Sequence, residues 1–221
     1  MQKRFNRKRM DAVQMTVGAF CAALNIAGAY IALCLKLPIY MDNIGTILAG
    51  ALLGPGYGIA AALGSGIISG MTTDIYAIYF MPDGMLTGMM AGFLFRTPLF
   101  KTDGPGAAKT KADTLGGRIT RMLPGSWRFP VGVAVMAGPG TIAAAVISAC
   151  VFSGVTSSGS GILVQVLSHL GCDMVISAFI VQIFTNYADR FISLSLVMIL
   201  LSYMTGEMRR RLVKERYYGK I

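Results

Sequence analysis

Charged residues are scarce in this chain. Asp, Glu, Lys and Arg make up 14% of its 221 residues, whereas hydrophobic residues make up 54%. A water-soluble domain usually carries about 25% charged residues. So few charges do not cover a water-exposed surface of ordinary composition. The composition therefore excludes a typical soluble domain and predicts a protein with several membrane-spanning segments.

Histidine and cysteine are also rare. His169 is the only histidine, which excludes a histidine-rich metal site, and the four cysteines show no C-x-x-C spacing. The sequence has no G-x-S-x-G serine motif and no G-x-x-x-x-G-K-[ST] phosphate loop. We therefore expect no catalytic residue, no metal site, no cofactor and no ATPase in this chain. Any process that requires energy would then depend on an ion gradient or on a partner.

The basic residues gather in three segments. The formal net charge is +10, and 18 of the 20 Lys and Arg residues lie in the N-terminal arm, in the segment 96–128 and in the tail from Arg209. In a soluble domain this excess would suggest nucleic acid binding. Between and outside apolar runs it is explained by the positive-inside rule, which places all three segments in the cytoplasm. We therefore expect no nucleic acid partner.

Uncharged apolar runs define the predicted spans. The first run follows a basic arm but is about 24 residues long, too long for the apolar region of a signal peptide, so we predict a retained helix. Six spans are predicted, at about 12–35, 43–54, 57–77, 84–96, 131–155 and 189–206. Two of them, 43–54 and 84–96, are too short to cross a bilayer unaided, so we expect them to line a cavity that opens outward.

Two segments between the spans are predicted to be loops. The segment 97–130 is basic and rich in Gly and Pro, which indicates a cytoplasmic loop. The segment 162–188 is apolar but interrupted by polar residues, and as a seventh span it would place the chain ends on opposite sides. We predict a helical outer loop there. The expected fold is an all-α integral membrane protein of the plasma membrane, one domain over 1–221, with six transmembrane helices and both termini cytoplasmic.

Acidic and aromatic residues converge on the outer face of this topology. Five of the ten acidic residues fall there, and ionisable groups near membrane depth normally pair, face water or serve function. For single residues, loop solvation and an interfacial aromatic belt remain alternatives. Asp189-Arg190 is expected to open the last helix and Asp42-Asn43 the second, either as structural clasps or as ligand contacts. The candidate substrate-binding residues are Tyr40, Asp42, Asn43, Tyr79, Asp83, Asn186, Asp189 and Arg190.

Small residues repeat along the first predicted helix. Ala19, Ala23 and Ala27 recur every four residues, and this spacing leaves one helix face with little side-chain volume. Such a face allows another helix to approach closely. The sequence leaves open whether that helix belongs to this protein's own bundle or to a partner membrane protein.

The order of these features resembles a known family. The run LKLPIYMDNIGTILAGALLGPGYGIAAALGSGI (Leu35–Ile67) contains a proline-marked outer loop, an aspartate, a G-T-containing helix and a G-P-x-x-G turn. The run NYADRFISLSLVMILL, from Asn186, has an acidic-basic pair at a helix start. Both resemble the substrate-binding S-components of energy-coupling factor (ECF) transporters. Arg190 stands where that family usually has lysine, and the segment 97–130 is unusually long.

The resemblance implies a specific function. S-components bind a vitamin or related micronutrient on the outer side, then associate with a membrane coupling subunit and two cytoplasmic ATPases, which use the ATP. The alanine face would then be the docking surface. Three alternatives come from other classes. They are a membrane sensory module, for which the chain after the last helix is expected to be too short, a gradient-driven permease, and a membrane-embedded enzyme.

Overall fold

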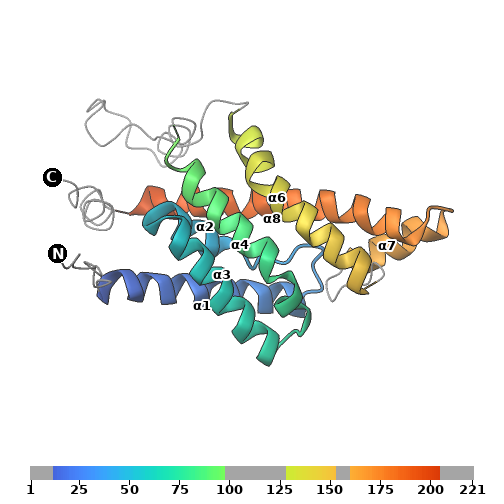
Figure 1. Ribbon diagram of the computed structural model, residues 1–221, viewed down its shortest axis with the longest axis horizontal. Coiled ribbons are helices and arrows are strands. Elements are labelled where there is room, and N and C mark those ends of the chain that lie inside the picture. The colour runs from blue at the N-terminus through green and yellow to red at the C-terminus, as the bar shows by residue number, and fades with distance from the viewer. Residues whose placement is uncertain (1–11, 98–127, 153–159, 205–221) are drawn as a thin grey trace, which may run out of the picture.

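The computed structural model describes residues 12–97, 128–152 and 160–204, and every regular element within these ranges is a helix (Figure 1). In chain order the helices are α1 (Ala12–Cys34), α2 (Ile44–Leu53), α3 (Pro55–Thr72), α4 (Tyr76–Leu94), α6 (Arg128–Phe152), α7 (Ser160–His169) and α8 (Met174–Tyr203). The predicted all-α class is confirmed for these ranges. The basic arm and tail, most of the predicted 97–130 loop, and the predicted span ends at 153–155 and 205–206 lie outside them.

Three helices are long and apolar enough to cross a membrane. They comprise 23 residues of α1, 24 residues of α6 (Phe129–Phe152) and 28 residues of α8 (Met174–Leu201). At 1.5 Å per residue these helices reach about 34 to 42 Å, compared with roughly 30 Å for a hydrocarbon core. The start of α1 and the end of α8 lie at the same end of the molecule, on the left in Figure 1. The six-span topology remains a prediction.

The turn predicted at Gly54-Pro55-Gly56 is confirmed. Gly54 ends α2 with a φ of 96°, a conformation that residues with a Cβ rarely adopt. Pro55 follows as the first residue of α3, where its missing N–H removes no helical hydrogen bond. A single residue therefore joins α2 to α3, and the two helices pack against each other.

The short helix α2 lies in the centre of the bundle. It has ten residues and packs against α1, α3, α4 and α8. Eight of the ten are buried, namely Gly45, Thr46, Ile47, Leu48, Ala49, Gly50, Leu52 and Leu53. The prediction of a short second helix is thus confirmed. Protein rather than lipid surrounds it, which is where a segment too short to span the bilayer is tolerated.

The predicted start of the fourth helix is wrong. The pattern of polar residues around Pro82 and Asp83 suggested a loop ending at Gly84, but α4 runs from Tyr76 to Leu94 with Pro82 in its interior. This helix is therefore 19 residues long rather than short. Asp83 is buried in the bundle, where a basic side chain of α8 compensates its charge.

The predicted outer loop at 162–188 is also wrong in its second half. Residues 174–188 form the first half of α8, and Asp189-Arg190 lies inside this helix instead of at its start. Asp173 is the actual N-cap, and its carboxylate accepts a hydrogen bond from the Val175 N–H at 2.9 Å. The first half of the predicted loop forms α7, which packs against α8. Charge spacing alone misplaced the boundary because the Asp189-Arg190 pair is stabilised by distant residues.

Glycines allow α3 and α4 to pack closely. A Cβ added to Gly58 would lie 2.6 Å from the backbone oxygen of Gly88, and a Cβ added to Gly88 would lie 2.6 Å from the backbone of Gly58. Both distances are far shorter than van der Waals contact. The two helix backbones therefore meet at this pair, as small-residue helix contacts in membranes do.

This contact predicts opposite effects for two substitutions in one helix. Gly58→Ala is expected to destabilise the protein by about 1–3 kcal/mol because the added methyl group forces α3 and α4 apart. Gly64→Ala is the matched control, because no atom lies within 4 Å of the added Cβ. It should be neutral or stabilising by up to about 1 kcal/mol through helix propensity. Thermal unfolding of both variants in detergent measures the contrast, and equal effects would contradict the packing described here.

Candidate ligand-binding site

The loop 35–43 connects α1 to α2 and is held by contacts from α1 and α8. Lys36 and Met41 adopt left-handed backbone conformations, with φ values of 48° and 51°, which are unfavourable for residues with a Cβ. The Met41 N–H donates a hydrogen bond of 2.7 Å to the Asp189 carboxylate of α8. The Met41 carbonyl also packs against Gly28 of α1, where a Cβ would clash with it. Contacts from α1 and α8 thus fix a strained loop.

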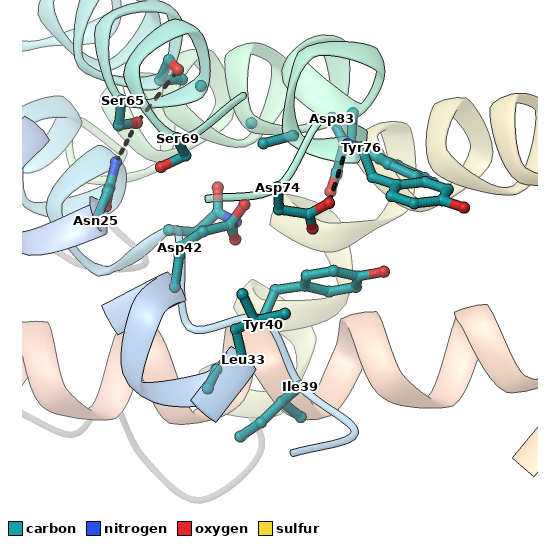
Figure 2. A pocket seen from close by; sticks show the side chains of 18 of the residues that line it. Asn25, Leu33, Ile39, Tyr40, Asp42, Ser65, Ser69, Asp74, Tyr76 and Asp83 are labelled. Atoms are coloured by element: carbon teal, nitrogen blue, oxygen red, sulfur yellow. Dashed lines mark hydrogen bonds between the residues drawn. The ribbon is translucent and has the colours of Figure 1, made fainter. Parts of the chain in front are cut away.

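A pocket opens between this loop, the second half of α1, and α2, α3, α4 and α8 (Figure 2). It contains about 980 Å³ of space not filled by atoms, a volume that includes its open mouth. A concave site among helices of this kind suits a small molecule. The polar lining residues are Asn25, Lys36, Tyr40, Asp42, Asn43, Thr46, Ser65, Ser69, Thr73, Asp74, Tyr76, Asp83, Gln182, Asn186 and Arg190.

Arg190 connects α8 to α4 beneath the pocket. Its side chain is 2% exposed. Its Nη2 lies 2.6 Å from the Asp83 carboxylate, its Nη1 donates to Asp189, and its Nε donates to the Thr87 hydroxyl at 3.0 Å. The planar guanidinium group thus donates in three directions at once, a geometry that an ammonium group on a flexible stem does not reproduce.

Asn25 connects α1, α2 and α3 at the inner end of the pocket. Its amide nitrogen donates to the hydroxyls of Thr46 at 2.7 Å and Ser65 at 3.1 Å. Its oxygen accepts from the backbone N–H groups of Gly45 at 2.7 Å and Thr46 at 3.1 Å. Asn43 occupies the N-cap position of α2, as predicted, but makes no side-chain capping bond. The capping acceptor is therefore supplied by Asn25 from another helix.

Asp42 lies in the wall of the pocket, outside the helices. Burial raises the pKa of its carboxyl group to about 7. The Asp189 and Asp83 carboxylates act in the same direction, whereas the Arg190 guanidinium opposes them. The Asp42 carboxyl group consequently gains or loses its proton near neutral pH. An ordinary aspartate loses its proton at a much lower pH, about 4.

Two buried amide atoms on the pocket wall have no hydrogen-bond partner among the residues that the structure describes. They are Oδ1 of Asn43 and Nδ2 of Asn186, and both residues are at least nine-tenths buried. Buried polar atoms are almost always hydrogen-bonded, because an unmade bond costs about 1–3 kcal/mol. An acceptor and a donor are thus available to an occupant of this pocket.

Six of the eight predicted binding residues line this one pocket, namely Tyr40, Asp42, Asn43, Asp83, Asn186 and Arg190. Two do not. Tyr79 is 47% exposed, and its ring packs edge-on against Phe152 with centroids 5.1 Å apart. Asp189 is buried behind the pocket, where it holds Met41 and Arg190.

Several lining residues were missed from the sequence, among them Asn25, Ser65, Ser69, Phe80 and Gln182. Asn25 carried a usable signal, because a polar amide in the middle of an uncharged span normally has a specific partner. Ser65 and Ser69 carried none, because both read as ordinary small residues of a membrane helix.

The alanines of α1 lie on its outer face. Ala19, Ala23 and Ala27 are all exposed, whereas the buried positions of the helix are Cys21, Asn25, Gly28 and Ala32. The small-residue face is therefore not used to pack α1 into this chain's own bundle. Of the two interpretations left open by the sequence, internal packing is excluded for the residues that the structure describes.

Comparison with known protein families, with curated proteins and with solved structures finds nothing that matches this chain.

Proposed function

We propose that this protein is the substrate-binding membrane subunit of an ATP-driven ECF-type importer for a vitamin or related micronutrient. The observation that carries the proposal is the pocket itself. A small-molecule cavity among the helices presents unpartnered, buried amide atoms of Asn43 and Asn186, together with aromatic walls. Such a lining is typical of a specific ligand site.

The position of the pocket supports capture on the outer face. The loop 35–43 and the start of α4 border it, whereas the start of α1 and the end of α8 lie together at the far end of the bundle (Figure 1). In the proposed topology the basic arm and tail extend from that far end into the cytoplasm. The pocket then faces the outside.

Two experiments test this function. Mass spectrometry of the protein purified in detergent is expected to identify a co-purified small organic molecule in near-stoichiometric amount. Uptake into proteoliposomes is then expected to require a coupling subunit, two ATPases and ATP. Uptake driven by an ion gradient alone would instead support a permease, and ligand-dependent signalling without uptake would support a sensory module.

The exposed alanine face of α1 is the proposed docking surface for the coupling subunit. Ala23→Leu is expected to reduce uptake at least about tenfold, because the larger side chain prevents close helix approach. Ligand binding and thermal stability should stay unchanged, because Ala23 points away from the bundle.

Ala134→Leu on α6 is the matched control, because Ala134 is also exposed and apolar but lies on another helix. It should leave uptake unchanged. Equal loss of uptake in both variants, or loss of ligand binding in Ala23→Leu, would contradict a docking role for α1.

A further inference from the structure

The inner part of the pocket has an excess of negative charge. One guanidinium group, that of Arg190, contacts two carboxylates, those of Asp83 and Asp189. Asp42 adds a third carboxylate and makes no ion pair with any residue that the structure describes. Lys36 and Asp74 also line the pocket, and their opposite charges add no net charge to the lining. With all three carboxylates ionised, the group formed by Asp42, Asp83, Asp189 and Arg190 therefore has a net charge of −2.

Hydrogen-bond acceptors are concentrated at the same place. The Asn43 amide nitrogen donates to the Asp42 carboxylate, which leaves Oδ1 of Asn43 as a buried acceptor without a donor. Two neighbouring residues thus present acceptors, a carboxylate and an amide oxygen. On α8, Asn186 presents the complementary group, a donor nitrogen without an acceptor among the described residues. An occupant that makes these hydrogen bonds has N–H donors for Asp42 and Asn43 at one edge and an acceptor for the Asn186 amide nitrogen at another position.

The remaining walls suit a flat ring. Tyr40, Tyr76 and Phe80 line the pocket, and the rings of Tyr40 and Phe80 have centroids 6.3 Å apart. Figure 2 shows the labelled side chains of Tyr40 and Tyr76 bordering the same space as Asp42. Aromatic faces attract both flat rings and cations. Ala62 and Gly66 of α3 also line the pocket, and both pack closely against α4.

We propose that the ligand is a small aromatic or heteroaromatic cation whose N–H groups, of the amidine or amino-heterocycle type, donate to Asp42 and Asn43. This inference rests on the proposed function and specifies its substrate class. Ionised Asp42 provides the counter-charge, and Asn43 Oδ1 accepts the adjacent N–H. Asp189 and Oδ2 of Asp83 stay paired with Arg190, while Oδ1 of Asp83 is a further buried acceptor that has no partner among the described residues.

Three probes of nearly equal shape test the charge class, namely benzamidine, benzamide and benzoate. Ligand-observed NMR on the full chain in nanodiscs measures their affinities. Benzamidine is expected to bind at least about tenfold more tightly than benzamide, because its donors meet a carboxylate and not a neutral acceptor. Benzoate should not bind, because it adds a negative charge to a negative site.

The pH profile and two isosteric variants test whether Asp42 is the carboxylate that binds benzamidine. Since the pKa of Asp42 is about 7, its ionised fraction falls about tenfold between pH 8 and pH 6, and benzamidine affinity should fall with it. The other charged or titratable groups around Asp42 are Lys36, Tyr40, Asp74, Tyr76, Asp83, Asp189 and Arg190. Asp42→Asn should weaken binding at least about tenfold and remove the pH dependence, while thermal stability is retained. Asp173→Asn, at the distant N-cap of α8, should change neither.

The outcomes separate the two proposals. Benzoate or benzamide binding as tightly as benzamidine would overturn the cationic class while leaving a small-molecule site. Unchanged, pH-dependent benzamidine binding in Asp42→Asn would overturn the role of Asp42. Binding of none of the three probes to the wild-type protein would overturn the cationic class and count against the pocket as a ligand site, and so against the proposed function.

Discussion

Arg190→Met is expected to lower the free energy of unfolding by about 3–5 kcal/mol. The substitution keeps an unbranched side chain of similar length but removes the only cation of the described ranges that contacts Asp83 and Asp189. Both carboxylates then remain buried without compensation. Thermal unfolding in detergent should show a large fall in the midpoint.

A combined variant distinguishes lost charge compensation from lost packing. If uncompensated carboxylates cause the instability, Arg190→Met together with Asp83→Asn and Asp189→Asn should recover most of the loss, because no buried charge remains. Lys36→Met is the control for removal of a cation. Lys36 is exposed, so its substitution should change stability by less than about 0.5 kcal/mol. Failure of the combined variant to recover stability would show that Arg190 acts mainly through packing.

Arg190→Lys addresses the departure from the family that the sequence resembles. The guanidinium group contacts Thr87, Asp189 and Asp83 through three different nitrogens. Lysine keeps the charge but concentrates its donors on one atom, so it does not reach all three partners. We expect Arg190→Lys to be less stable than the wild type but more stable than Arg190→Met.

Asn25→Leu is expected to destabilise the protein by about 2–5 kcal/mol, the second large effect. The carboxamide oxygen accepts from the Gly45 and Thr46 N–H groups at the start of α2. Leucine has the same branching and number of side-chain heavy atoms but is bulkier, so it excludes water from the position while offering no acceptor. Each buried N–H without a partner costs about 1–3 kcal/mol. Thermal and denaturant unfolding of the purified variant measure the effect.

Asn25→Ala provides the comparison. Asn25 borders the pocket, so a smaller side chain leaves space in which water can reach the freed N–H groups. The alanine variant should therefore be more stable than the leucine variant, although it removes more side-chain volume. The reverse order would mean that packing rather than capping is the main contribution of Asn25.

Local features of the fold were predictable from the sequence. Apolar runs identified α1, α2 and α6 to within a few residues, because a continuous run of apolar residues can be recognised within one segment of the sequence. The turn at Gly54 was predictable because its φ of 96° favours glycine, and the following proline suits a helix start. The candidate site was found in part, because polar residues flanking apolar runs gather at one end of a bundle.

The failures share a cause. Pro82-Asp83 and Asp189-Arg190 were interpreted as boundaries, since isolated charges inside a membrane helix are costly. The cost depends on partners that the local pattern does not show. Asp83 and Arg190 are 107 residues apart and contact each other at 2.6 Å, so both remain inside helices. The same reasoning explains why Asp189 lies behind the pocket rather than in its lining.

That this chain is helical and apolar, with its basic residues in three segments, follows from composition and hydrophobic runs, which act locally. Which polar residues are paired, and which face the pocket without a partner, depends on how the helices pack. Arg190 compensates Asp83 and Asp189, while Asp42 and the amide of Asn43 are left facing the pocket. The physical reason is that the energy of a buried polar group is set by its neighbours in space, and these come from distant parts of the chain.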